Sequence, residues 1–523
     1  MKQEYEAIVI GGGMAGLTST AYLCKNGIRP LLVEKSEKTG GLVNAFRHKG
    51  FAFDAGIRAF ENSGILFPML KNLGIDIQFE SDPVSIGICD QWKKLSSNEI
   101  LQDYSSMLKT IFPNNTTDIS RIMDEIKKVI GYMDVLYGID NPLFMENLRD
   151  REYLTKTLLP WMIKYKFNVR KAERLNEPIN DHLELFTKNK ALIDIISQHF
   201  FKDTPAFFAL SYFGLYRDYA YPLGGTGVLA EKLTEYIAGS GGQILTSVCA
   251  NEIDPKKHEI LLSEDEKLSY KKLIWAADQK TLYSAIKNFD SPDFKKQHLL
   301  VEGNSGGDSI LTLFMGIDLS KDYFHDRCGA HSFYTPSSGG ISSLPDFRDA
   351  AKRGTDFLLE WVGNYLEKTT YEISCPVLRD ASLAPEGKTG LIVSTLMDYD
   401  IVRIFYDSDQ YGAFKQYCSE KIKDILSKSV FHDIKEKMLF SLCATPLTIE
   451  RETGNYKGAI TGWAFTKKTI PAENHFRKIT RSTKTPIPDV MQCGQWTFSP
   501  SGLPISVLTG KLAADGVCKT LKG

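Results

Sequence analysis

Several features that mark large classes of protein are absent from this sequence. Its nine cysteines stand singly along 523 residues, with no CxxC pair, so we expect neither a disulfide framework nor a metal site. No stretch approaches the roughly 18 apolar residues that a membrane-spanning helix needs. The 63 basic and 64 acidic residues leave a net charge of −1, which excludes binding to nucleic acid through bulk charge.

What the chain does contain is an ordinary globular composition, 43% hydrophobic and 24% charged. At about 150 residues per domain, its length predicts roughly three to four domain-equivalents. The first residues, MKQEYEAIVIGGG, enter a strand pattern at once and leave no room for a signal peptide. Together with the scattered cysteines, this predicts a cytoplasmic protein in a reducing compartment.

A short N-terminal unit carries the first functional motif. Residues 7–10 are apolar and predict a strand that is buried on both faces. Gly11, Gly13 and Gly16 follow in G-x-G-x-x-G spacing, a helix is predicted over 14–26, and a second apolar run at 31–33 ends at Glu34. Strand, glycine loop, helix, strand and acidic residue in this order are typical of dinucleotide binding.

Each residue of this motif stands at its position for a physical reason. Gly11 permits the tight turn, Gly13 lets the backbone approach the pyrophosphate, and Gly16 allows the helix to pack closely on the strand. The first turn of the helix presents free N–H groups and the positive end of its dipole to the phosphates. Glu34 suits a ribose hydroxyl and would repel a 2′-phosphate, so NADP is disfavoured here while NAD and FAD remain.

The residues after Glu34 separate these two cofactors. Gly40-Gly41-Leu42 comes next, and then Phe53-Asp54-Ala55-Gly56-Ile57. With these blocks the chain resembles the two-dinucleotide-binding-domain flavoproteins, in particular the phytoene desaturase, carotenoid isomerase and retinol saturase superfamily. In that superfamily the double glycine lies beside the FAD pyrophosphate, and the FDxG stretch runs close to the flavin ring.

Further blocks extend the resemblance over nearly the whole chain. They are YPLGGTG at 221–227, DASLAPEG at 380–387, TPLT at 445–448, TGN at 453–455, CGQW at 493–496 and PSGLP at 500–504. The resemblance implies FAD as the cofactor, with these residues holding it: Gly11, Gly13, Met14, Ala15, Gly16, Glu34, Lys35, Gly40, Gly41, Leu42, Gly56, Ile57, Val248, Gly494, Gly502, Leu503 and Pro504.

The resemblance also implies an α/β fold with a discontinuous architecture. A Rossmann-like FAD-binding domain would be built from 1–75, 220–285 and 485–523, and a substrate-binding region from 76–219 and 286–484, with a mixed sheet and a helical lid. The residues themselves add two expectations. Large apolar side chains recur every three or four positions over 119–133, which predicts a buried helix face rather than a cofactor site. Residues 243–253 predict one strand.

Two residues are candidates for contact with the substrate. Arg58 follows Gly56-Ile57 where retinol saturases carry histidine, and since arginine stays protonated it is expected to bind an anionic head group or to steady reduced flavin, with a structural ion pair as the alternative. Tyr221 is the second candidate, with plain burial as the alternative. The aromatic-rich segment 207–219 suits a channel wall or ordinary core equally. No side chain is identified as the catalytic acid or base.

Two segments are rich in basic residues. Residues 161–174 interleave apolar side chains with lysine and arginine, a composition that suits a membrane interface, although a solvated helix face is the plainer interpretation. Residues 467–484 hold six cations and one acid. We interpret that segment as an exposed connection, with NAD(P)H docking as the alternative.

These observations predict an FAD-dependent oxidoreductase that acts on carbon–carbon double bonds of a long apolar polyene or isoprenoid substrate. Saturation, desaturation and isomerisation share the scaffold, and the FDxGIR segment slightly favours saturation. NAD(P)H as electron donor is left open, as are peripheral membrane contact and the oligomeric state. The alternative is a non-enzymatic prenyl-lipid-binding chaperone on the same fold, like the GDP-dissociation-inhibitor and Rab-escort proteins, and the C-terminal flavin signature favours the enzyme.

Overall fold

The computed structural model describes residues 4–61, 63–81, 83–95, 99–145, 151–216, 219–263 and 266–522. The predicted N-terminal strand is β1 (Glu4–Ile10), which lies inside a seven-stranded sheet of order β10-β2-β1-β13-β12-β11, with β19 also paired to β13. The other strands of this first sheet are β2 (Leu31–Val33), β10 (Gln243–Leu245), β11 (Ala250–Asp254), β12 (Glu259–Leu262), β13 (Lys267–Trp275) and β19 (Val490–Gln492).

The pairing within this sheet confirms the predicted fold class. β10, β2, β1, β13 and β19 pair in parallel, whereas β11 and β12 form an antiparallel hairpin on β13. The carboxyl ends of the parallel strands therefore meet at one edge, which is where doubly wound α/β folds bind their ligands. The strands of this part of the sheet come from three segments that lie far apart in the sequence.

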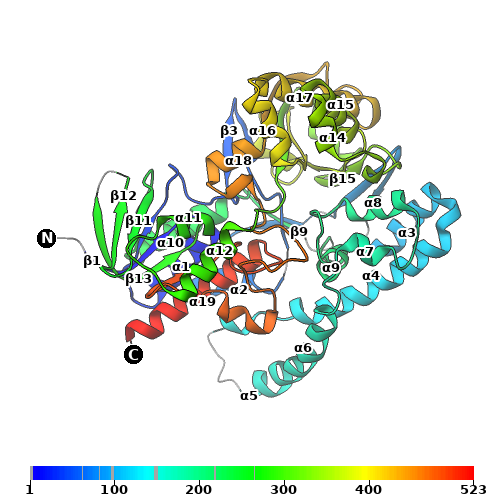
Figure 1. Ribbon diagram of the computed structural model, residues 1–523. Helices are drawn as coiled ribbons and strands as arrows, with labels where there is room; N and C mark the ends of the chain where they lie inside the picture. The colour runs from blue at the N-terminus through cyan, green and yellow to red at the C-terminus, as the bar shows by residue number, and fades with distance from the viewer. Residues whose placement is uncertain are drawn as a thin grey trace.

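Helices cover both faces of the first sheet (Figure 1). Ala7 and Val9 of β1 pack in one core with α1 (Met14–Lys25), α10 (Val228–Gly239) and α19 (Leu503–Lys522), while Ile8 and Ile10 pack in another. Side chains alternate across a strand, so β1 is buried on both sides as predicted. Further helices of this region are α2 (Leu66–Leu73), α11 (Gln279–Ala285) and α12 (Pro292–Glu302).

A second seven-stranded sheet forms the floor of the other half of the molecule. Its order is β18-β14-β17-β16-β15-β7-β8, and one face packs against helices in an apolar core. The strands are β7 (Ser85–Ile88), β8 (Gln91–Lys94), β14 (Ile310–Ile317), β15 (His331–Thr335), β16 (Tyr371–Ser374), β17 (Thr389–Leu396) and β18 (Met438–Ala444), and the accompanying helices are α13 (Lys321–His325), α14 (Phe347–Arg353), α15 (Thr355–Leu366), α16 (Tyr399–Asp407), α17 (Tyr411–Ser429) and α18 (Pro446–Thr453).

A helical region lies beside this sheet, at the right of Figure 1. The predicted buried stripe belongs to α4 (Thr116–Tyr137), and Ile119, Ile122, Ile126 and Val129 are all fully buried, which confirms their role in the core. The other helices of the region are α3 (Ile100–Ile111), α5 (Arg151–Tyr153), α6 (Leu159–Ala172), α7 (Ile179–Leu183), α8 (Lys190–Ser197) and α9 (Ala206–Leu215).

Two small sheets connect these regions. β3 (Ala45–His48) pairs with β4 (Phe51–Asp54), and β9 (Tyr219–Pro222) lies between β5 (Phe60–Glu61) and β6 (Phe79–Ser81). One strand prediction was wrong: 243–253 forms two strands, β10 and β11, with different partners. The chain turns between them at Ser247, whose φ is +63°, and this turn brings Val248 to the carboxyl end of β2.

Candidate functional site

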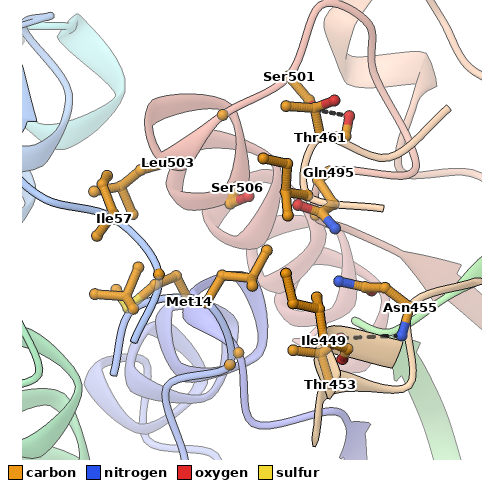
Figure 2. Close-up of a pocket in the computed structure, with 18 of the residues that line it drawn as sticks. Met14, Ile57, Ile449, Thr453, Asn455, Thr461, Gln495, Ser501, Leu503 and Ser506 are labelled. Atoms are coloured by element: carbon orange, nitrogen blue, oxygen red, sulfur yellow. Dashed lines mark hydrogen bonds between the residues drawn. The ribbon is translucent and has the colours of Figure 1, made fainter. Parts of the chain in front are cut away.

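A large cavity of about 1270 Å³ is lined by residues of both the first and the second sheet. Its wall includes the loops at the carboxyl ends of β1 and β2, the start of α19, and the inward face of the second sheet. Figure 2 shows the part nearest α19, with Leu503 beside Ile57, Met14 below them, and Ile449 and Asn455 on the opposite side.

The glycine loop after β1 opens into this cavity. Gly13 is the N-cap of α1, with φ −71° and ψ 178°. Gly13, Met14 and Ala15 line the cavity, and the first N–H groups of a helix have no partner within it. Gly40 donates its N–H to the carbonyl oxygen of Gly12 at 2.8 Å, and Gly41 packs directly on Gly13. Two glycine motifs that are separate in the sequence thus form one cradle.

Glu34 stands at the carboxyl end of β2, where the fingerprint predicts it. Its Oε2 accepts the N–H of Gly12 at 2.6 Å and its Oε1 accepts the N–H of Ser36 at 2.8 Å. The N–H of Val248 donates to the carbonyl oxygen of Glu34 at 3.0 Å. Lys35 Nζ donates to the carbonyl oxygen of Arg451 at 2.9 Å, which ties the segment after β2 to α18.

The C-terminal motif closes the other side of the cradle. α19 packs along α1 so closely that a Cβ at Gly510 would lie 2.5 Å from the carbonyl oxygen of Ala15. The Gly494 N–H donates to Thr509 Oγ1 at 2.9 Å, and Ser501 Oγ donates to the carbonyl oxygen of Thr461, a bond that Figure 2 draws. These contacts place 502–504 and the N-terminus of α19 at the cavity wall.

The residues of this cradle fit FAD. A Cβ placed on Gly13 would meet no atom within 4 Å, so the backbone there borders open space, as close approach of a pyrophosphate requires. Helix N–H groups suit the phosphates and the Glu34 carboxylate suits ribose hydroxyls. When bound, FAD supplies the exchange of a hydride with the substrate.

The structure brings nearly all predicted site residues to this one cavity. The cavity is lined by Gly11, Gly13, Met14, Ala15, Glu34, Lys35, Gly40, Gly41, Leu42, Gly56, Ile57, Arg58, Val248, Gly494, Gly502, Leu503 and Pro504. Gly16 and Tyr221 are not part of the lining. Gly16 instead lies against Gly11, where a Cβ would come within 1.8 Å of the Gly11 carbonyl oxygen, so its contribution is to pack the helix on the loop.

Tyr221 has a structural contact in place of a cavity contact. Its ring is fully buried, and its hydroxyl donates to Asp54 Oδ2 at 2.9 Å. Thr226 donates its N–H to Asp54 Oδ1 at 2.8 Å and its hydroxyl to the same oxygen at 2.9 Å. The YPLGGTG segment thereby anchors the FDxG segment, and we assign Tyr221 to that anchor.

Arg58 does line the cavity, but most of its donors point into the protein. The side chain is almost completely buried, at 3% exposed. Its Nη1 donates to the carbonyl oxygens of Asp54 and Gly56, and its Nη2 donates to Ser394 Oγ at 3.1 Å. Burial lowers the pKa of Arg58, while the carboxylates of Glu372 and Asp54 oppose that shift. Arg58 therefore places a fixed positive charge at the cavity wall.

The titratable groups that share the cavity with Arg58 were not predicted from the sequence. Glu61, His331 and Glu372 line the same cavity, together with the aromatic side chains of Tyr212 and Tyr219. The one available signal was Glu372 itself, a charged residue inside the otherwise apolar or small sequence of β16. The segment 207–219 serves both expected purposes, since Phe208 and Tyr212 line the cavity whereas Ala209 and Leu210 are in the core.

The two basic segments differ in their surroundings. In 467–484, Lys467 pairs with Asp181 at 2.8 Å and Arg477 with Glu173 at 2.9 Å, and Phe476 reaches the cavity. In α6, Trp161 and Tyr165 line the cavity, while Leu159, Met162, Ile163 and Phe167 are each more than half exposed.

Within the residue ranges that the structure describes, no helix has the length and apolar character needed to cross a membrane. The same ranges hold no group of three or more histidine, cysteine, aspartate or glutamate side chains arranged to bind a metal ion.

Comparisons with known proteins agree with this geometry. The model of the flavin containing amine oxidoreductases matches residues 14–518. Prolycopene isomerase 1 of an Oncidium hybrid cultivar is 25% identical over 495 residues, which cover 87% of this chain and 75% of the relative. All-trans-retinol 13,14-reductase of Danio rerio is 23% identical (94% and 82% covered), and 4,4'-diapophytoene desaturase of Staphylococcus aureus is 21% identical (98% and 99% covered).

Solved structures show the same fold. A variant of putrescine oxidase has a TM-score of 0.62 at 10% identity, with 99% of both chains covered. Reduced UDP-galactopyranose mutase has a TM-score of 0.59 at 12% identity, with 99% of this chain and 96% of the mutase covered. At such identities the likeness extends to the fold alone.

Proposed function

The chain belongs to the family of flavin-containing amine oxidoreductases, and we propose that within this family it acts on carbon–carbon double bonds of a long apolar polyene or isoprenoid. It is an FAD-dependent oxidoreductase related to the carotenoid desaturases, the carotenoid isomerases and retinol saturase. The observation that carries the proposal is the cavity, which continues from the FAD cradle into a space lined by Phe200, Phe208, Phe314, Phe333 and Leu442. Such a lining favours a long apolar ligand.

The proposal also concerns the direction of the reaction, which is saturation, desaturation or isomerisation. The relatives include an isomerase, a reductase and a desaturase, so all three directions stay candidates, and the FDxGIR segment keeps saturation slightly ahead. We assign Arg58 the role of a fixed positive charge and not that of a proton donor. Its guanidinium stays protonated and donates hydrogen bonds to backbone carbonyl oxygens. The comparisons give no support to NAD(P)H as the electron donor, and the identity of the donor stays open.

We also propose that α6 rests on an anionic lipid surface. Four large apolar side chains of α6 are exposed, namely Leu159, Met162, Ile163 and Phe167, and Leu143 outside the helix is exposed as well. Exposed lysines and arginines flank them at Lys156, Lys164, Lys166, Arg170 and Lys171. Apolar side chains ringed by cations suit the boundary between acyl chains and anionic head groups.

The position of α6 links this surface to the cavity. Trp161 and Tyr165 on the same helix line the cavity, as does Leu143, which is also 39% exposed. α6 lies at the lower edge of the molecule in Figure 1. An apolar substrate dissolved in the lipid would thus meet the cavity wall beside α6 without crossing water.

The function is tested by supplying substrates of the three related reactions. The FAD-loaded protein is incubated without oxygen, with its flavin either oxidised or chemically reduced, with prolycopene, all-trans-retinol or 4,4'-diapophytoene in vesicles. Chromatography with mass spectrometry then shows whether the substrate loses two hydrogens, gains two or changes isomer. We expect conversion of at least one polyene, and unchanged substrates in both flavin states would contradict the proposal.

A further inference from the structure

Two titratable side chains meet at the cavity on neighbouring strands of the second sheet. His331 on β15 and Glu372 on β16 both line the cavity, and His331 Nε2 lies 3.2 Å from Glu372 Oε1. The imidazole is 1% exposed, whereas the carboxylate side chain is 35% exposed. Since both residues line the cavity, the carboxylate is the member of the pair that is open to a ligand.

The buried imidazole makes no hydrogen bond among the described residues. This holds for both His331 Nδ1 and His331 Nε2, and the approach of Nε2 to Glu372 Oε1 is a close ion-pair distance only. The rings of Tyr219 and Phe333 pack against the imidazole, with centroids at 5.1 Å and 5.4 Å. A buried polar atom without a partner is costly in a structural site, so a histidine at this place points to a use within the cavity.

Arg58 supplies a fixed positive charge to the same place. Its guanidinium is held by the carbonyl oxygens of Asp54 and Gly56 and by Ser394, the register partner of Glu372 on β17. Burial by itself would raise the pKa of Glu372, but His331 and Arg58 outweigh burial, and the pKa lies below its ordinary value. Glu372 is therefore ionised at neutral pH.

A second carboxylate in the cavity, that of Glu61, has its pKa shifted in the opposite direction. Glu61 accepts a hydrogen bond from the Tyr212 hydroxyl, and Tyr219 donates to Tyr212 at 3.2 Å. Burial raises the pKa of Glu61, and the charge of Glu372 raises it further. Two carboxylates in one site whose surroundings push their pKa values apart identify the group that is ready to accept a proton.

We propose that Glu372 is the base that accepts the proton accompanying hydride exchange with the substrate, and that His331 positions it. The inference rests on the proposed function. In the hydrogen-removing direction, bound FAD would supply the two-electron oxidant by accepting the hydride that leaves one substrate carbon. The C–H bond of the adjacent carbon breaks, its electron pair becomes the new π bond, and the proton forms an O–H bond with the Glu372 carboxylate. Saturation reverses each transfer.

The test compares two cavity carboxylates and one conservative change. Glu372→Gln removes the base, Glu372→Asp shortens it, and Glu61→Gln removes the other carboxylate as a matched control. The charged and titratable groups that face Glu372 are Arg58, His331, Glu61, Tyr216 and Tyr219, with Arg379 beside His331, and all of them stay in place in Glu372→Gln. Steady-state rates are measured over a pH series with the polyene that the wild type converts.

We expect Glu372→Gln to lower kcat by about 100-fold or more, as loss of a general base does, and to abolish one limb of the pH profile. Glu372→Asp should recover part of the rate, with that limb of the pH profile displaced along the pH axis. Glu61→Gln should keep the limb of the pH profile. A Glu372→Gln enzyme with the wild-type profile would overturn the inference, as would loss of the limb in Glu61→Gln instead. A wild type that converts no polyene would count against the proposed function itself.

A second readout is independent of turnover. Nitrogen NMR of protein labelled with ¹⁵N-histidine, assigned with a His331→Gln variant, reports which ring nitrogen carries the proton. We expect the Nε2-protonated tautomer of His331 in the wild type and a changed tautomer ratio in Glu372→Gln. An unchanged His331 signal in that variant would show that the pair does not form and would overturn the positioning role.

Discussion

Gly16 packs against Gly11 so closely that a Cβ on Gly16 would lie 1.8 Å from the Gly11 carbonyl oxygen. Gly13, between them, is in the reverse situation, because a Cβ there would meet no atom within 4 Å and would border the cavity. Glycine is therefore required at these two positions of one motif for two different physical reasons. Gly16 is required by packing within the protein, and Gly13 by the space left for the cofactor.

This difference predicts opposite results for two alanine variants. Gly16→Ala should lower the free energy of unfolding of the apoprotein by about 3 kcal/mol, the cost of overpacking. Gly13→Ala should leave that free energy within about 0.5 kcal/mol of the wild type, because φ is already −71°, but should weaken FAD binding at least 100-fold. Denaturant unfolding and FAD titration measure both, and equal destabilisation by the two variants would contradict the assignment.

Glu34 gives a second test of the cradle. Glu34→Ala removes the carboxylate that accepts the N–H groups of Gly12 and Ser36 and that would bind the ribose. We expect the FAD dissociation constant to rise about tenfold, as loss of a charge-assisted hydrogen bond predicts. Glu231→Ala, an exposed glutamate on α10, serves as the control. An FAD affinity equal to that of the wild type would refute the ribose contact.

The proposed lipid surface predicts a loss that depends on position. Replacing Ile163 and Phe167 together by serine should lower binding to vesicles that contain phosphatidylglycerol at least fivefold. Leu299→Ser, which removes a leucine that is 69% exposed on α12, should leave binding unchanged. Binding should also fall in high salt, since the flanking cations contribute. Equal binding of both variants to the vesicles would argue against a lipid surface. A dimer of the wild type that is lost only in the Ile163 and Phe167 variant would argue against it as well.

Asp308 predicts a pH dependence of stability. Burial raises the pKa of Asp308 to about 6, with Asp398 and Asp203 adding to the shift and Lys202 opposing it. A carboxyl group whose pKa is raised on folding stabilises the fold when protonated, and this contribution is lost as the pH rises through 6. The stability of Asp308→Asn relative to the wild type should therefore grow by about 2 kcal/mol between about pH 4.5 and 7.5. Urea unfolding at the two pH values measures the difference, and a constant difference would contradict it.

The cofactor site could be predicted because its residues stand in short ordered motifs. Gly11, Gly13 and Glu34 belong to one strand–helix–strand unit, whose geometry local sequence determines. The resemblance supplied the remaining blocks, including Gly494 and Leu503, which the structure brings to the same wall.

The proton-handling residues could not be predicted in the same way. His331 and Glu372 meet because β15 pairs with β16 in the observed register, and a shift of one residue would turn either side chain to the other face. Tyr221 shows a different limit, because residues two apart share one face of a strand. Tyr219 on β9 reaches the cavity, while Tyr221, two residues further along the same strand, reaches Asp54.

We expect the cradle to hold FAD and the cavity to deliver a polyene to it. The most direct measurement is the visible spectrum of the protein after reconstitution with FAD and gel filtration, recorded without oxygen before and after a polyene, NADH or NADPH is added. We expect flavin bands that stay with the protein and that are bleached by the polyene if the enzyme removes hydrogen, or by a reductant and then restored by the polyene if it adds hydrogen. A protein that retains no FAD would contradict the account and would favour a carrier of prenyl lipids.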